Sequence, residues 1–356
     1  MKIVAVKTRL EHLPLTRPYT IAYQTCDEAI NFILEIRTDD GRLGMGAAAP
    51  APEVTGETTT ACGDALGDDA LGWLIGADID RIGSLHRQLE RHMPADTPGA
   101  RAAVDIALHD LFAQRLAAPL VDVLGRVHHA LPTSVTIGIQ SVEETLDEAI
   151  EHIGHGFRVL KVKLGHSFEE DIARLTRLRE SLDKTIVIRI DPNQGYSIED
   201  LKKFVSRTKH LDIEFIEQPV TVDAMDRLRE LDSQIRDQIA ADESLLTARE
   251  AVALIAPPRA CGIFNIKLMK CGGIKPALDI ATVAETARVS LMWGCMDESI
   301  ISITAALHAA LACPATRYLD LDGSLDLARD VVAGGFILQE GCLSVSDAPG
   351  LGVMPL

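Results

Sequence analysis

Charged residues end a series of short apolar runs at a nearly constant interval in the second half of the chain. Asp191, Glu217 and Asp242 each close or directly follow such a run, 26 and then 25 residues apart. Lys267 comes a further 25 residues on. That interval fits one strand, one helix and their connections, so the four charges occupy equivalent positions in successive βα units. The pattern therefore predicts a parallel sheet covered by helices.

Seven apolar runs after Pro132 are predicted strands: Thr133–Gly138, Val159–Leu164, Ile186–Ile190, Ile213–Ile216, Ile239–Ala241, Gly262–Lys267 and Ser290–Trp293. Amphipathic patterns between them predict helices, including Glu169–Leu182, Ile198–Lys209 and Asp223–Leu231. About seven such units are enough to close a barrel over residues 126–322. An open doubly wound sheet stays as the alternative, although no GxGxxG motif opens any of these helices.

The two ends of the chain lack this rhythm. Residues 1–125 combine short β-rich runs, a hairpin signal around 38–42, and an Ala- and Leu-rich helical pattern at 100–112. They predict an α+β N-terminal domain. Residues 323–356 are expected to pack back on that domain.

Composition narrows the class of partner. The formal net charge is −17, from 35 basic and 52 acidic residues, which disfavours nucleic acid and anionic membranes and favours cations. Seven cysteines form no CxxC pair, and the N-terminus has no signal-peptide core, so a cytoplasmic location is expected. The uncharged stretch Ser299–Thr316 contains polar residues and predicts a buried helix rather than a membrane span.

Side chains alternate between the two faces of a strand, and this alternation predicts which charges share a face. Lys161 and Lys163 share one face of their strand, and Arg189 and Asp191 share the inward face of the next strand. In a βα barrel the C-terminal strand ends form one mouth, where catalytic groups gather. We therefore expect the two lysines and Asp191 to meet Glu217, Asp242 and Lys267 there.

Three converging carboxylates without His or Cys favour a hard cation, of which Mg²⁺ is the usual choice. A lysine that faces a second cation can give up its proton and act as a base. Lysines precede and follow the acids in strand order, so they should flank the metal on opposite sides. This arrangement suits removal of an α-proton and its return from the other face, with the metal stabilising the enediolate between the two transfers.

The ordered set KxK, Asp, Glu-Gln-Pro, Asp-Glu-Ser and Asn-x-Lys resembles the enolase superfamily, in its muconate-lactonizing-type subgroup, over essentially the whole chain. The resemblance implies a modified (β/α)7β TIM-type barrel with an α+β capping domain made from both termini. It implies that Asp191, Glu217 and Asp242 bind one Mg²⁺ per subunit. It also implies that Lys163 and Lys267 are the acid/base lysines and that Lys161 tunes Lys163.

A second motif resembles the dipeptide epimerases of that subgroup. Asp320 and Asp322 lie on one face of the predicted eighth strand, where an Asp-x-Asp pair of the family holds the substrate's free α-ammonium. An ordinary Asp-Gly turn is the alternative for Asp322. Thr136 matches a family position near the substrate.

The pocket differs from that of the L-Ala-D/L-Glu epimerases, which this chain resembles. Gln24 stands where those enzymes have an arginine for the glutamate side chain, in a loop that also contains Tyr23. Asp297 and Glu53 stand at positions that are usually apolar. One lost base and two added acids predict a substrate with Lys or Arg side chains.

The sequence therefore predicts an isomerase, an Mg²⁺-dependent epimerase that converts L,L-dipeptides to L,D by 1,1-proton transfer at the C-terminal residue. The alternatives are an L-Ala-D/L-Glu epimerase, an N-acylamino acid racemase, an o-succinylbenzoate synthase or a muconate cycloisomerase. A non-catalytic metal-binding protein of the same fold is an alternative of another class. A small dipeptide is the expected partner, nucleic acid and membrane are not, and a homo-oligomer stays open.

Overall fold

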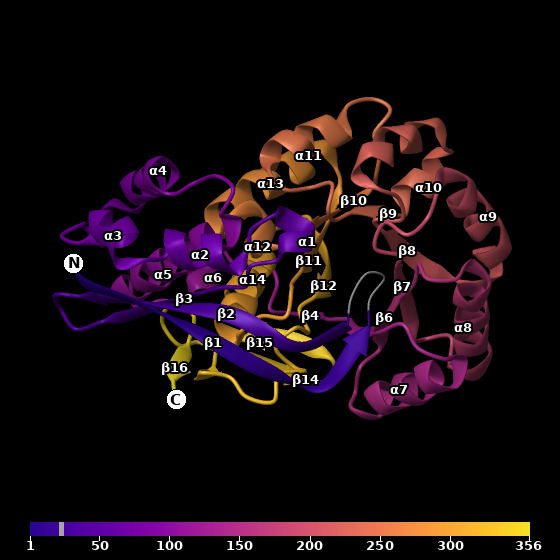
Figure 1. Cartoon of the computed structure of the whole chain (residues 1–356), viewed down its shortest axis with the longest axis horizontal. Helices are drawn as coiled ribbons and strands as arrows, with labels where there is room; N and C mark the ends of the chain where they lie inside the picture. The colour runs from indigo at the N-terminus through magenta and orange to yellow at the C-terminus, as the bar shows by residue number, and fades with distance from the viewer. Residues whose placement is uncertain (21–24) are drawn as a thin grey trace.

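Eight parallel strands form the centre of the molecule, a computed structural model that describes residues 1–20 and 25–356 (Figure 1). They pair in chain order as β5 Val135–Ile137, β6 Val159–Lys163, β7 Val187–Asp191, β8 Ile213–Glu217, β9 Ile239–Ala241, β10 Ile263–Ile266, β11 Ser290–Gly294 and β12 Thr316–Asp320. A parallel bridge between Thr133 and Leu319 joins the first strand to the last. The predicted barrel is confirmed, and the open doubly wound sheet is wrong.

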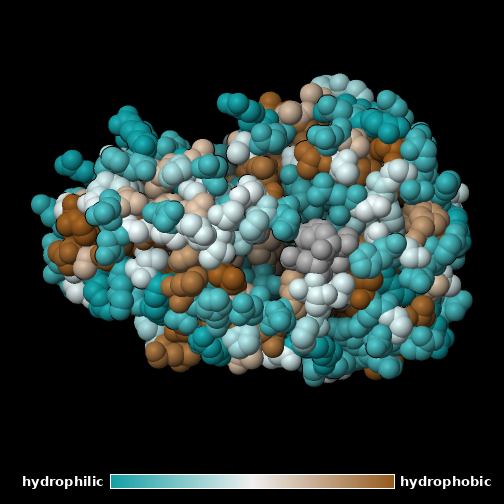
Figure 2. All heavy atoms as spheres, in the orientation of Figure 1, coloured by the Kyte–Doolittle hydropathy of each residue, from teal (hydrophilic) through white to brown (hydrophobic). Residues whose placement is uncertain are grey.

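Helices connect the strands and cover the outside of the barrel. They are α7 Val142–Gly154, α8 Phe168–Ser181, α9 Ile198–Thr208, α11 Ala248–Ile255, α12 Leu268–Cys271, α13 Ile274–Ala287 and α14 Ile300–Ala312. The outward side chains Leu160 and Val162 of β6 belong to the same buried cluster as Leu175 and Leu178 of α8. On the face shown in Figure 2, hydrophilic side chains predominate over these outer helices.

The connection from β8 to β9 corrects one prediction. The helix expected over Asp223–Leu231 is instead a 3₁₀ helix over Val222–Glu230 (η4), followed by the short α10 Ser233–Asp237. Met225 and Leu228 are its buried apolar side chains, and Leu231, directly after it, is buried at the same spacing of three residues. A 3₁₀ helix has three residues per turn, so this spacing places all three side chains on one face.

Arg189 fills the barrel interior below the mouth, as its inward position predicts. Its guanidinium lies over the rings of Phe215 and Tyr318, 5.2 and 5.0 Å from their centroids. It donates hydrogen bonds to the carbonyl of Leu319 (2.8 Å) and to the carboxylate of Glu214 (2.7 Å). The aromatic rings and these oxygens compensate the cost of burying the charge.

The N-terminal region forms a three-stranded antiparallel sheet, β1 Ile3–Thr20, β2 Thr25–Thr38 and β3 Leu43–Ala48. The predicted hairpin is confirmed, since the turn between β2 and β3 has Gly41 at φ 88°. Helix α5 Pro98–Arg115 packs on the sheet. The other helices of this region are α1 Pro52–Thr55, α2 Thr59–Ala65, α3 Asp68–Leu71, α4 Ile82–His92 and α6 Leu120–Leu124, with short 3₁₀ turns at Gly72–Leu74 and Ile79–Arg81. The 100–112 helical pattern lies in α5.

The C-terminal segment returns to the N-terminal region. Its strands are β13 Val332–Gly334, β14 Phe336–Gln339, β15 Cys342–Val345 and β16 Val353–Pro355, and β15 pairs with β4 Ala130–Pro132. Asp110 of α5 accepts hydrogen bonds from the amides of Met45 in β3 and Leu351 (3.0 and 2.9 Å). The cap is thus made from both termini. We propose the predicted boundaries 1–125, 126–322 and 323–356 as the domain division.

A glycine substitution tests the packing of the cap. A Cβ on Gly46 would lie 1.9 Å from the carbonyl oxygen of Ala103 in α5, so Gly46→Ala must push β3 away from that helix. We expect it to lower the free energy of unfolding by about 1–3 kcal/mol in urea denaturation.

Gly83→Ala is the matched control, because a Cβ there would have no tertiary neighbour within 4 Å among residues 1–20 and 25–356. It lies in α4 and should leave stability unchanged or raise it by up to about 1 kcal/mol. Equal stability of the two variants would contradict the close β3–α5 packing.

Candidate active site

The predicted acids meet at the C-terminal ends of the barrel strands. Asp191 is the last residue of β7, Glu217 is the last of β8, and Asp242 directly follows β9. All three carboxylates are buried. Lys163 ends β6 and Lys267 directly follows β10, so lysines stand on both sides of the acids in strand order.

Each lysine contacts one of these carboxylates. The Nζ of Lys163 lies 2.7 Å from Oδ2 of Asp191, and the Nζ of Lys267 lies 2.7 Å from Oδ2 of Asp242. Lys161 Nζ also reaches Asp191 Oδ2 (3.3 Å), and Glu217 Oε2 at 2.8 Å. Lys161 and Lys163 therefore share one carboxylate oxygen, an arrangement that lets each influence the other's charge.

The surroundings shift the acidities of this cluster. Burial and, after it, the charge of Asp191 raise the pKa of Glu217 to about 8. Burial and the charge of Asp242 likewise raise the pKa of Glu243 to about 7. Burial alone would raise the pKa of Asp242, but Lys267 and Lys270 hold it below the usual range. The raised pKa values of Glu217 and Glu243 mark two carboxylates whose negative charge a bound cation would favour.

The donor set fits Mg²⁺. Its oxygens come from carboxylates, the ligands that a hard cation prefers. Oε2 of Glu217 has no hydrogen-bond partner among the described residues apart from its ion pair with Lys161, and Oε2 of Glu243 has none. Buried oxygens of this kind are costly unless a cation or a donor meets them.

Several supporting residues escaped the sequence analysis. Asn265 donates to Glu217 Oε1 (2.8 Å), and the amide of Asn193 donates to Asp191 Oδ1 (2.9 Å). Lys270 donates to a carboxylate oxygen of Asp242 and to the carbonyl of Asn265. Asn265 stands in the strand-end motif Asn-x-Lys, which was the only signal for it.

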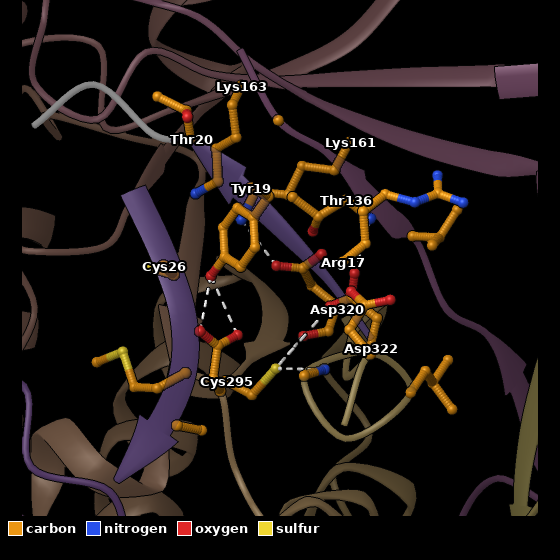
Figure 3. Close-up of a pocket in the computed structure, with 18 of the residues that line it drawn as sticks. Arg17, Tyr19, Thr20, Cys26, Thr136, Lys161, Lys163, Cys295, Asp320 and Asp322 are labelled. Atoms are coloured by element: carbon orange, nitrogen blue, oxygen red, sulfur yellow. Dashed lines mark hydrogen bonds and ion pairs between the residues drawn. The ribbon is translucent and has the colours of Figure 1, made fainter. Parts of the chain in front are cut away.

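Asp320 and Asp322 lie beside this cluster and face the same space (Figure 3). Asp320, the last residue of β12, accepts hydrogen bonds from Lys161 (2.7 Å) and from the hydroxyl of Ser134 (2.5 Å). Asp322 accepts a hydrogen bond from the backbone amide of Thr136 (2.7 Å). The side chain of Cys295 approaches both acids, which no sequence pattern indicated.

These two acids differ in charge balance. Burial and the charge of Asp320 raise the pKa of Asp322 to about 7. Burial would also raise the pKa of Asp320, but the ammonium of Lys161 outweighs it and holds the pKa below the usual range. Asp322 is therefore the acid whose charge lacks compensation.

The cap supplies the other wall of a pocket of about 1010 Å³. The hydroxyl of Tyr19, at the end of β1, donates to both carboxylate oxygens of Asp297 (3.0 and 2.9 Å). Figure 3 shows Tyr19 reaching toward the barrel residues. Glu53 of α1 also lines the pocket and is exposed, whereas Tyr23 and Gln24 lie outside the described residues. Tyr19 was missed because its partner lies 278 residues away.

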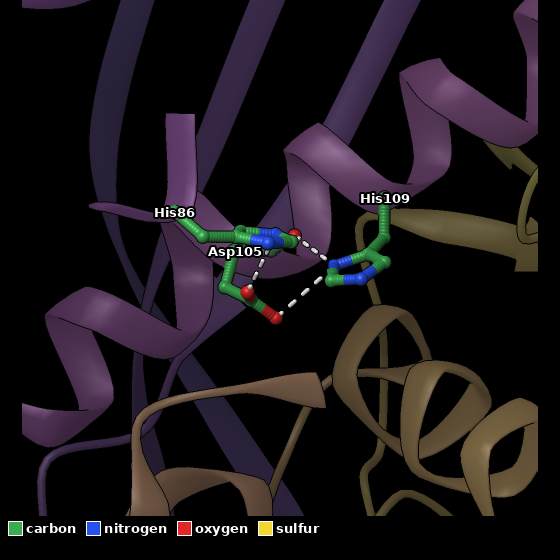
Figure 4. Close-up of side chains that lie close together, drawn as sticks. All are labelled: His86, Asp105 and His109. Atoms are coloured by element: carbon green, nitrogen blue, oxygen red, sulfur yellow. Dashed lines mark hydrogen bonds and ion pairs between the residues drawn. The ribbon is translucent and has the colours of Figure 1, made fainter. Parts of the chain in front are cut away.

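A second buried cluster lies between the cap and the barrel (Figure 4). His86, Asp105 and His109 form the one group of three His, Cys, Asp or Glu side chains, among residues 1–20 and 25–356, with ligand atoms within 4.8 Å of one another. Nδ1 of His109 faces Asp105 Oδ2 (3.2 Å) and its backbone oxygen (2.9 Å), so it carries a proton. Oδ2 of Asp105 accepts a hydrogen bond (2.5 Å) from the backbone amide of Ile274, at the start of α13. The cluster is thus a helix cap that fastens α5 to α13.

Family comparisons agree with this architecture. Residues 3–125 match the mandelate racemase / muconate lactonizing enzyme N-terminal domain, and residues 144–355 match the enolase C-terminal domain-like family. The chain belongs to the enolase superfamily, in its muconate-lactonizing-type subgroup.

Comparison with individual relatives identifies the family within this subgroup. An L-Lys-D/L-Arg epimerase of Methylococcus capsulatus is 61% identical, and one of Desulforapulum autotrophicum is 54% identical, each match covering 99% of both chains. A crystal structure of a dipeptide epimerase from Methylococcus capsulatus with Mg and the dipeptide L-Arg-D-Lys has a TM-score of 0.98 at 61% identity, covering 99% of this chain and 100% of that chain. The chain is a member of the dipeptide epimerase family.

Among residues 1–20 and 25–356, no helix combines the length and apolar character that crossing a membrane requires. The cytoplasmic location stays a prediction.

The contrast between Asp320 and Asp322 predicts opposite effects of two isosteric substitutions. Asp322 has a raised pKa, so its ionisation destabilises the fold as pH rises from about 4 through about 7. Asp322→Asn should raise the free energy of unfolding at pH 8, by an amount that shrinks as pH falls toward 4. Urea denaturation of the unliganded protein at several pH values measures it.

Asp320→Asn is the matched variant and should behave oppositely. Asp320 has a lowered pKa, so it stabilises the fold above its ordinary pKa, and this stability is lost as pH falls. Removing it leaves Lys161 without its 2.7 Å partner, which should destabilise the protein at pH 8. The same sign of effect for both variants would contradict this account.

Proposed function

We propose that the protein is an Mg²⁺-dependent dipeptide epimerase that favours dipeptides with Lys or Arg side chains. The observation that carries this proposal is the pair of lysines on opposite sides of three buried carboxylates, Lys163 on one side and Lys267 on the other. The relatives support the substrate class, since two of them, at 61% and 54% identity, are L-Lys-D/L-Arg epimerases.

In this proposal Asp191, Glu217 and Asp242 hold the metal. When bound there, Mg²⁺ would stabilise the negative charge that develops on the substrate's terminal carboxylate as the α-proton leaves. Asp320 and Asp322 hold the N-terminal ammonium. Asp322 is suited to this, because it gains a counter-ion that the protein alone does not give it.

The two lysines then act on opposite faces of the same α-carbon. One removes the proton, and the ammonium of the other returns a proton from the far side, which inverts the configuration. The family resemblance assigns Lys163 to the L face. Lys161 shares Asp191 with Lys163 and so helps to set the charge state in which Lys163 is a base.

Asp297 is proposed to select the side chain of the C-terminal residue. The charges of Lys163 and Lys267 contribute to its pKa, so it lies within electrostatic reach of the two bases that flank the α-carbon. A cationic side chain on that residue would find a partly buried carboxylate already oriented by Tyr19. Glu53 at the rim and Thr136 complete the proposed substrate contacts, and Gln24 and Tyr23 stay sequence-based members of this set.

Replacing one base separates proton exchange from epimerisation. Lys267→Ala should abolish conversion of L,L-dipeptides in D₂O, while Lys163 still exchanges the α-proton of the L,L epimer without inverting it. Lys163→Ala should show the converse, exchange confined to the L,D epimer. Mass spectrometry reads exchange, and chiral chromatography reads conversion.

Conversion by Lys267→Ala at the wild-type rate would defeat the two-base scheme. A Lys275→Ala variant serves as the control, because Lys275 is an exposed residue that pairs with Asp279 on α13, and it should keep both activities.

The environment of Asp297 predicts a pH dependence for substrate binding. Burial raises the pKa of Asp297 to about 6, and the hydrogen bond from Tyr19 opposes that rise. As pH falls through about 6 the carboxylate gains a proton, so KM for Ala-Lys should rise about three- to tenfold between pH 7.5 and 5. Tyr19→Phe should move this rise to higher pH.

Ala-Leu is the control substrate, because its C-terminal side chain has no charge for Asp297 to attract. Its KM should change much less over the same range. A parallel rise for both substrates would count against the assignment of Asp297.

A further inference from the structure

Asp326 is an acid of the pocket wall that has no assigned partner. Two neighbouring acids of that wall are paired: Glu148 lies 3.5 Å from His152, and Glu151 lies 3.1 Å from Arg17. The carboxylate of Asp326 makes no hydrogen bond or ion pair with any residue in the described ranges 1–20 and 25–356. It is partly buried, and burial raises its pKa. A half-desolvated acid of this kind gains from a cation supplied by a ligand.

The backbone around Asp326 is held firmly. Its carbonyl oxygen accepts hydrogen bonds from the amide (2.7 Å) and the hydroxyl (3.1 Å) of Thr16 in β1. The next residue, Leu327, forms an antiparallel bridge with Leu15. The side chain of Asp326 therefore lines the pocket where the barrel meets the cap. Its contacts with β1 fix its position relative to the barrel mouth.

Its position relates it to one end of the proposed substrate. Asp326 lies four residues after Asp322, and its charge contributes, after burial and Asp320, to raising the pKa of Asp322. The bound ammonium of the N-terminal residue would sit at Asp320 and Asp322. The side chain on that same α-carbon consequently starts next to Asp326, whereas the C-terminal side chain starts between the two lysines.

The wider surroundings also favour positive charge. Glu148 and Glu151 of α7 line the same wall, and their two carboxylates face the single guanidinium of Arg17. His152 faces Asp326 as well as Glu148. With Asp326 included, three acids stand against one permanent cation.

We propose that Asp326 selects a cationic side chain on the N-terminal residue of the dipeptide, separately from Asp297, which selects the C-terminal side chain. This inference rests on the proposed function. It divides the pocket into two acidic subsites, one on each side of the peptide bond, and it adds a specificity residue that the sequence motifs did not indicate.

Three substrates separate the two subsites: Lys-Lys, Ala-Lys and Lys-Ala. Asp326→Asn should lower kcat/KM about tenfold for Lys-Lys and Lys-Ala while leaving Ala-Lys within about twofold. Asp297→Asn should instead impair Lys-Lys and Ala-Lys. Initial rates of epimerisation with Mg²⁺ present give all the values.

Glu143→Gln is the matched control for overall charge. Glu143 is exposed on α7 and does not line the pocket, so this variant loses one negative charge without touching either subsite. This variant should leave kcat/KM unchanged for all three substrates. Asp326→Lys guards against misfolding as an explanation, since it should prefer Glu-Lys to Lys-Lys, a gain that an unfolded protein cannot show.

The outcomes distinguish a failure of the proposed function from a failure of the role proposed for Asp326. If the wild type epimerises no dipeptide, the proposed function fails and this inference fails with it. If the wild type is active but Asp326→Asn keeps the wild-type ratio of Lys-Lys to Ala-Lys, the inference alone is overturned. An equal loss on all three substrates overturns it too, because a structural defect would not discriminate between them.

Discussion

The balance of charge at the barrel mouth is the constraint on which the rest of the structure depends. Six buried carboxylates lie there beside four ammonium groups: Asp191, Glu217, Asp242, Glu243, Asp320 and Asp322, against Lys161, Lys163, Lys267 and Lys270. With all six carboxylates ionised, the fold alone leaves two negative charges uncompensated. A divalent cation supplies that amount of charge, and the ammonium of a substrate adds to it. The raised pKa values of Glu217, Glu243 and Asp322 are the protein's response to the same excess.

The barrel and the cap contribute different groups to the site. The barrel strands hold in fixed register the groups proposed to bind the metal and to transfer protons, because each lies at or next to a strand end. The cap supplies Tyr19 and Glu53, whose elements cover the mouth. Asp105 fastens α5 to the start of α13, a few residues after Lys267. The substrate preference can therefore vary through the cap and its seam while the chemistry stays in the barrel.

Periodicity made the barrel and its acids predictable. A constant interval of one βα unit places Asp191, Glu217 and Asp242 at one end of a parallel sheet whatever the intervening helices contain. Interactions that depend on barrel closure or cap placement carry no such signal. Ser134 meets Asp320 across 186 residues and Tyr19 meets Asp297 across 278. The 3₁₀ segment Val222–Glu230 was mistaken for an α-helix because spacings of three and four residues look alike in a short stretch.

The same physics separates structural acids from those that await a ligand. Asp320 accepts hydrogen bonds from Lys161 and Ser134, so its charge stabilises the unliganded protein. Asp322 has one backbone amide and Asp326 no partner among the described residues, so their charges cost free energy until a cation arrives. Only a ligand with positive charge in the right place offsets that cost. A group that is unfavourable in the free protein thereby gives the complex its selectivity. A neutral side chain offsets none of the cost at Asp326, so the proposed discrimination against dipeptides with a neutral N-terminal side chain follows from this acid and needs no steric exclusion.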